Sequence, residues 1–85
     1  NVGDYDVAYR LLRQAVGDGL KNGEERARAY KYLAFIDCSR GNNGECRDSF
    51  RKAMKADPNF KLRKSELGHP LWGPVYEDVI AERKP

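Results

Sequence analysis

The sequence predicts an all-α domain, and three observations support this. Apolar residues recur every three or four positions in four segments, the spacing that places them on one face of a helix. Glycine, asparagine and proline separate these segments. No stretch alternates apolar and polar residues as a half-buried strand would. The chain has 85 residues, 40% hydrophobic and 34% charged, a length and composition that suit one small folded domain.

The first expected helix spans residues 5–16. Its apolar positions form one stripe: Tyr5, Val7, Ala8, Leu11, Leu12, Ala15 and Val16. We expect Gly17, Asp18 and Gly19 to end this helix, because paired glycines destabilise a helix and readily adopt turn conformations.

The second and third helices are expected over residues 23–39 and 45–56. Between them, residues 40–44 read Arg-Gly-Asn-Asn-Gly. Gly and Asn tolerate positive φ at low steric cost, so we expect a tight turn that makes the two helices antiparallel. Asp57 and Pro58 should end the third helix, since the residue before a proline is pushed out of the helical region.

The C-terminal part is expected to begin irregularly, over residues 59–73. Ser65 and Glu66 are able to start one helical turn there. A last helix should begin at Pro74, because proline is preorganised for a first helical position. Its apolar stripe comprises Val75, Tyr76, Val79 and Ile80.

The second and third predicted helices carry a known repeat pattern. Its residues are Tyr30, Leu33, Ala34, Gly41, Cys46, Phe50, Ala53 and Pro58. In this spacing, residues 28–59 resemble one complete tetratricopeptide repeat (TPR), a unit of two antiparallel helices. The start of the chain resembles the second half of an earlier repeat, through Gly3, Asp4, Tyr5, Asp6, Ala8, Leu12 and Ala15.

The resemblance implies a right-handed superhelical array of about one and a half repeats over residues 1–60. An irregular linker and a C-terminal capping helix, residues 61–85, would complete the same compact domain. We also expect the parent protein to continue upstream of Asn1. Asp37 and Cys46 depart from the repeat pattern, which usually has an aromatic and an alanine there, so the packing between the two helices should differ locally.

Cys38 and Cys46 lie eight residues apart with the predicted turn midway between them. In an antiparallel hairpin they would stand at similar height on facing helices, where a disulfide is geometrically possible. The alternative is two small buried thiols in a cytoplasmic protein. The symmetric placement favours the disulfide, and a bridge would indicate an oxidising compartment such as a periplasm or the cell exterior.

Several classes of function are not expected. The chain has one histidine, His69, no nucleophile with an evident base and no Gly-rich phosphate loop, so we expect no enzyme activity and no cofactor. One imidazole without paired cysteines makes a metal site unexpected. The net charge of +3 is spread along the chain, which does not favour nucleic-acid binding. No apolar run approaches the roughly 20 residues of a membrane span.

The TPR resemblance also implies a binding surface. In that family the first helices line a concave groove that takes peptides, and the matching positions here are Arg28, Lys31, Phe35 and Ser39. Two cations beside an aromatic ring suit an acidic or C-terminal peptide. An equally open interpretation is that Arg28 and Lys31 only solubilise the surface.

Trp72 lies in the segment Gly-His-Pro-Leu-Trp-Gly-Pro, residues 68–74. It would either anchor a partner or, as we favour, cap the last repeat. The leading hypothesis is a noncatalytic protein-interaction scaffold or adaptor, in a bacterial envelope or secretion-associated assembly if the cysteines are bridged. The alternative is an accessory enzyme domain that guides a glycan or acidic polymer through Trp72 and the basic residues 61–64. A packed Trp72 would argue against that alternative.

Overall fold

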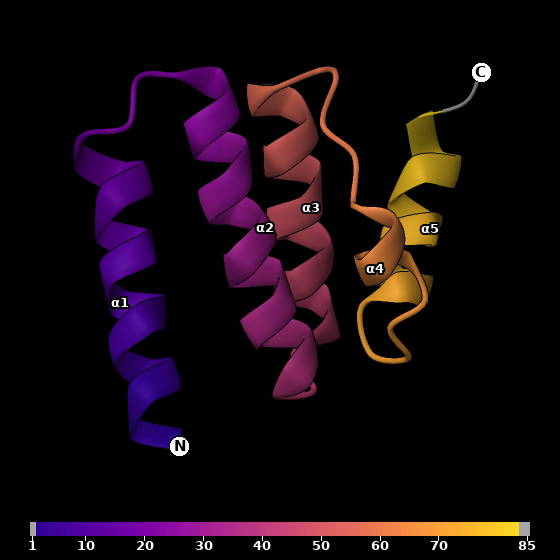
Figure 1. The fold of residues 1–85 in the computed structure, drawn as a ribbon, viewed down its shortest axis with the longest axis horizontal. Helices are drawn as coiled ribbons and strands as arrows, with labels where there is room; N and C mark the ends of the chain where they lie inside the picture. The colour runs from indigo at the N-terminus through magenta and orange to yellow at the C-terminus, as the bar shows by residue number, and fades with distance from the viewer. Residues whose placement is uncertain (1, 84–85) are drawn as a thin grey trace.

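The computed structural model describes residues 2–83, and this part of the chain is all-helical, as predicted. Its helices are α1 (Val2–Asp18), α2 (Gly23–Ser39), α3 (Asn43–Ala56), α4 (Lys64–Leu67) and α5 (Gly73–Arg83). The three long helices α1, α2 and α3 run up and down in a row, with α5 beyond α3 (Figure 1). Residues 1, 84 and 85, which belong to the predicted ranges 1–60 and 61–85, lie outside the described part.

Helix α1 is longer than the predicted 5–16, because it begins at Val2 and ends at Asp18, within the segment 17–19 that was expected to stop it. The N–H groups of Gly19 and Leu20 both donate to the carbonyl oxygen of Ala15, which closes the last turn. The Arg26 guanidinium donates to the carbonyl oxygens of Val16 and Leu20, at 3.0 and 3.1 Å, so carbonyls at the helix end gain a cationic partner from α2.

The turn between α2 and α3 is a Schellman motif. Gly41 has a φ of 82°, its N–H donates to the Cys38 carbonyl, and the Asn42 N–H donates to the Asp37 carbonyl at 2.8 Å. Helix α3 starts at Asn43, two residues before the predicted position, so the turn is shorter than expected. Within this hairpin the Cα atoms of Cys38 and Cys46 are 5.3 Å apart and the two sulfurs form a disulfide, which confirms the predicted pairing.

The start of α2 lies close against the end of α3. A Cβ atom on Gly23 would come within 2.4 Å of the Ala56 carbonyl oxygen, so the close approach of the two backbones requires glycine at this position. Asn22 caps the helix, and its side chain accepts a hydrogen bond from the Glu25 N–H at 3.1 Å. Gly23 at this end of the α2–α3 pair and Gly41 at the turn therefore both have a conformational reason in the structure.

The hydrophobic core lies between α2, α3, α5 and the loop before α4. It comprises Ala34, Cys38, Cys46, Phe50, Met54, Leu62, Val75, Tyr76 and Val79. Among the described residues, this cluster includes none from α1. Phe50 is completely buried and makes edge contacts with the rings of Phe35 and Tyr76. The core thus belongs to α2, α3, α5 and the loop before α4, and α1 is attached to its side.

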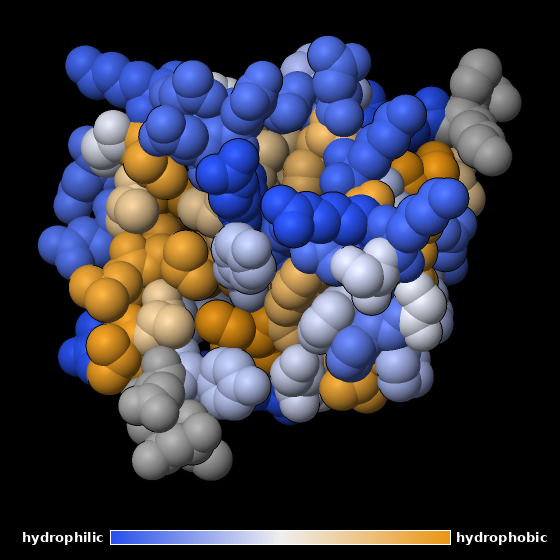
Figure 2. Space-filling model, in the orientation of Figure 1, coloured by the Kyte–Doolittle hydropathy of each residue, from blue (hydrophilic) through white to orange (hydrophobic). Residues whose placement is uncertain are grey.

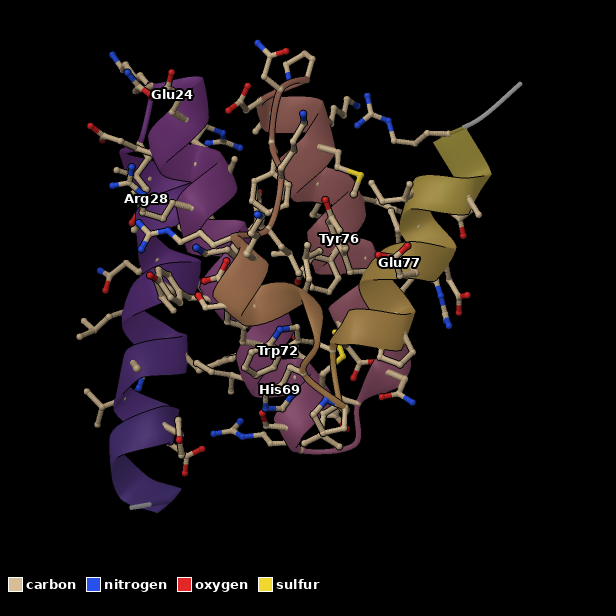
Figure 3. The ribbon with its side chains drawn as sticks, turned by 45° about the vertical axis from the view of Figure 1, so that its right-hand side comes forward. Glu24, Arg28, His69, Trp72, Tyr76 and Glu77 are labelled. Carbon is tan, nitrogen blue, oxygen red and sulfur yellow. A yellow bond between two sulfur atoms is a disulfide. The ribbon has the colours of Figure 1, made fainter. Side chains whose placement is uncertain are left out.

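The segment between α3 and α5 folds back across α2. Its one helical turn, α4, confirms the short helix expected around Ser65 and Glu66. Leu62 is buried, and its N–H contacts the Tyr76 hydroxyl at 3.4 Å. In Figure 3, α4 and the loop with His69 and Trp72 lie in front of α2. This arrangement decides how much of the face of α2 stays open.

Candidate functional site

An open apolar groove of about 620 Å³ runs between α1 and α2. Helix α1 contributes one wall through Tyr5, Ala8, Leu11 and Leu12. Helix α2 contributes the other through Tyr32, Phe35, Ile36 and Ser39, and Trp72 closes one side. Figure 2 shows the apolar side chains gathered over α1 and its seam with α2, while hydrophilic side chains cover the top of this face.

The groove exists because α1 has a wider apolar face than α2 can cover. Leu11, Tyr5 and Val7 are 60%, 57% and 48% exposed. At 100° per residue, Val7 and Leu11 lie at one margin of the apolar arc, while Tyr9 lies at the margin that contacts α2. Large apolar side chains are thus left facing water along about two turns of helix.

Polar contacts hold α1 on α2. The Tyr9 hydroxyl donates to a carboxylate oxygen of Asp37 at 3.2 Å. Arg40 pairs with Asp6 and also lies over the Tyr9 ring. These contacts orient α1 against α2 but do not fill the space between the two helices, so the groove beside them remains open.

Both faces of the Trp72 indole are covered by other rings. Phe35 stacks on it with the ring centroids 3.9 Å apart, and His69 stacks with centroids 3.4 Å apart. Two rings this close to one centroid must lie on opposite faces. The indole N–H donates to the Glu66 carbonyl oxygen at 2.9 Å, and the His69 Nδ1 accepts from the Leu71 N–H at 3.1 Å. Only the edge of Trp72 is therefore presented to the groove.

Lys31 is buried rather than open to a ligand. It is 6% exposed, and its Nζ lies 3.0 Å from Oε2 of Glu66 on α4. The other carboxylate oxygen of Glu66 accepts a hydrogen bond from the Arg63 N–H at 2.8 Å. Burial raises the pKa of Glu66, but the Arg63 N–H and the Lys31 ammonium outweigh this, so its pKa lies below the ordinary value. This ion pair fastens α4 onto α2.

The predicted binding residues fall into three groups. Phe35, Ser39 and Trp72 meet in the apolar groove, although Phe35 lies under Trp72. Lys31 is taken up by Glu66 within the chain. Arg28 is exposed and lines a neighbouring polar hollow, one helical turn before Tyr32. The structure thus brings three of the five together.

The wall supplied by α1 was missed from the sequence. The sequence pattern places Tyr5 and Leu11 on the apolar stripe of the first predicted helix and does not identify them as binding residues. The signal was available, because the apolar positions of residues 5–16 span more of the helix circumference than one neighbouring helix covers.

Comparisons with protein-family models, with curated proteins and with solved structures find no match to this chain. Among the described residues, no helix is long and apolar enough to cross a membrane. Within that same part of the chain, no three His, Cys, Asp or Glu side chains are grouped as they would be to hold a metal ion.

Asp37 is a buried polar residue in the seam between α1 and α2. It is 2% exposed and accepts the hydrogen bond from Tyr9. Burial raises the pKa of the Asp37 carboxyl above its ordinary value, although the Tyr9 hydrogen bond and the charges of Arg13 and Arg40 act in the opposite direction. Burial and the nearby Asp37 likewise raise the pKa of Tyr9.

A raised carboxyl pKa makes the fold weaker as pH rises. Between the unfolded value of about 3.9 and the higher folded value, the folded state binds more protons, so the free energy of unfolding falls with increasing pH. Asn at position 37 keeps an oxygen for Tyr9 and removes the buried charge. We therefore expect Asp37→Asn to gain stability relative to the wild type as pH rises from 3 to 7 in urea unfolding. Asp78→Asn, at an exposed carboxylate, is the control. A variant at position 37 that loses more than about 1 kcal/mol at pH 7 would contradict this account.

Proposed function

We propose that this chain is a noncatalytic protein-interaction module that binds its partner in the groove between α1 and α2. The observation that carries the proposal is the apolar groove itself, which is lined by large side chains and which no element of the described part of the chain covers. Exposed aromatic and aliphatic side chains in a concave surface are typical of interfaces, where a few such residues supply most of the binding energy.

A TPR-like arrangement of α1, α2 and α3 is part of this proposal. Its support is the up-and-down order of the helices, the left-handed Gly41 at the turn, and the complete burial of Ala34, Phe50 and Ala53. The face of α2 on which TPR proteins take peptides is here covered by the chain's own α4 and Trp72. Binding is therefore expected in the adjacent groove. The Cys38–Cys46 disulfide supports work in an oxidising compartment.

The glycan-platform alternative loses support from the geometry of Trp72. An aromatic platform binds a sugar through a free ring face, and both faces of this indole are occupied by Phe35 and His69. The basic residues 61–64 would have to act without that platform. The interaction module is the better proposal.

Peptide display against the immobilised protein tests the proposal. Leu11→Glu places a charge in the groove, and Leu67→Glu is the matched control, since Leu67 is exposed but lies outside the groove. We expect peptides enriched on the wild-type protein to bind the Leu67 variant normally and to lose about tenfold or more in affinity for the Leu11 variant. Equal loss on both variants, or no enrichment over the Leu11 variant, would refute a binding function for the groove.

A further inference from the structure

We propose that the groove between α1 and α2 receives an amphipathic helix of a partner protein, with acidic residues at the end of that helix nearest Arg28. This inference rests on the proposed function and names the partner's chemistry. It follows from the shape of the groove, from its lack of backbone hydrogen-bonding groups, and from the charges beside one end.

The walls of the groove have helical spacing on both sides. On α1 the lining positions 5, 8 and 12 are separated by three and four residues, and on α2 the lining positions 32, 35 and 39 are separated in the same way. The two walls therefore run alongside each other for about two helical turns, or roughly 10 Å. A third helix fits such a seam, because its side chains at the same spacing interdigitate with both walls. Ala8, between the larger Tyr5 and Leu11, leaves room for a knob from that helix.

An extended peptide would fit the groove poorly. Its backbone N–H and C=O groups need partners when they are buried, and modes that bind extended chains supply them from a sheet edge. Here both walls are helices whose backbone groups are already paired within the helix, and Ser39 is the one small polar side chain in the lining. A helical partner satisfies its own backbone and needs only apolar contacts.

The charges beside the groove favour an acidic end on the partner. Arg28 lies one turn before Tyr32 on α2, and it shares a polar hollow with Lys61 and Arg63. Two carboxylates, Glu24 and Asp57, line the same hollow, so its three exposed cations outnumber them. Lys31 adds nothing to this balance, because Glu66 neutralises it. This excess of positive charge is small. It favours a negatively charged residue at the adjacent end of the partner, but it does not supply most of the affinity.

The test uses a stapled helical peptide of about 14 residues that contains no aromatic residue. Leucines at positions i, i+3, i+4 and i+7 form its stripe, and glutamates occupy one end. Trp72 is the only tryptophan of the chain and lines the groove, so its emission reports binding. We expect a micromolar Kd. A peptide of the same composition with the stripe scrambled should bind at least about tenfold more weakly, and Leu11→Glu should abolish binding.

Charge is tested with a second peptide that carries lysines in place of the terminal glutamates. The wild-type protein should prefer the acidic peptide, and Arg28→Glu should reverse the preference, because the exposed Arg28 then carries the opposite charge. An unchanged preference would overturn the charge assignment.

Two further results would overturn the helix assignment. One is that the striped and scrambled peptides bind with equal affinity, or that neither peptide binds. The other is sedimentation of the unliganded protein as a dimer that Leu11→Glu converts to a monomer, which would make a second copy the occupant. If display selection had still produced groove-dependent peptides that are not helical, the interaction function would stand and only this inference would fall.

Discussion

Replacing Phe50 with alanine should lower the free energy of unfolding by about 3–5 kcal/mol, the largest effect we expect from a single substitution. The Phe50 side chain is completely buried and meets Phe35 and Tyr76 at centroid distances of 6.3 and 5.4 Å. Its removal leaves a cavity where α2, α3 and α5 meet, and a closely packed interior relaxes only in part around such a cavity.

The measurement is urea unfolding followed by circular dichroism, with Trp72 emission as a second probe. Because Phe35 contacts both Phe50 and Trp72, the emission of the folded variant should also change. Leu71→Ala is the control, since Leu71 is 49% exposed, and it should cost under about 1 kcal/mol. A loss below 1 kcal/mol for Phe50→Ala would mean that the core is not centred on this ring.

Removal of the disulfide by the double substitution C38A/C46A should cost about 2–3 kcal/mol. The bond closes a loop with a sequence separation of eight residues, and most of its effect in the chain-entropy model comes from restricting the unfolded state. For a domain of this size the melting temperature should fall by about 10–20 °C. Both cysteines are buried, 2% and 0% exposed, so a reductant should act on the native protein only after it opens.

Thermal melts of the wild type and the double variant, with and without dithiothreitol, provide the test. The reductant should lower the melting temperature of the wild type and leave that of the variant unchanged, which serves as the internal control. Two free thiols in the unreduced, denatured wild type would contradict the disulfide.

The helices could be predicted from the sequence because their signals are local. The apolar spacing of residues 23–39, the Gly41 turn and Pro58 each act within a few positions, and the structure follows them. Helix α1 ends at Asp18, two residues beyond the predicted 5–16, and part of the stabilisation of its end is not local. The carbonyl oxygens of Val16 and Leu20 accept hydrogen bonds from Arg26, which belongs to the next helix.

The difference between local and long-range interactions also explains why the candidate site was only partly predicted. Lys31 reads as an exposed cation in its own helix, but its partner Glu66 lies 35 positions away in a segment without a strong pattern. The covering of Phe35 by Trp72 likewise depends on how the C-terminal segment folds back. Long-range pairings of this kind are set by tertiary packing, and helical periodicity alone does not contain them.

The attachment of α1 outside the core has an energetic consequence. The disulfide and the buried cluster both lie within residues 34–79, so the domain has a rigid part and, in α1, a helix with few buried apolar contacts. Such a helix opens locally at a lower free energy than the whole domain unfolds. A ligand seated on α1 would shift that opening equilibrium by mass action, so part of the binding free energy would appear as order gained in α1. Recognition and completion of the fold would then be one process.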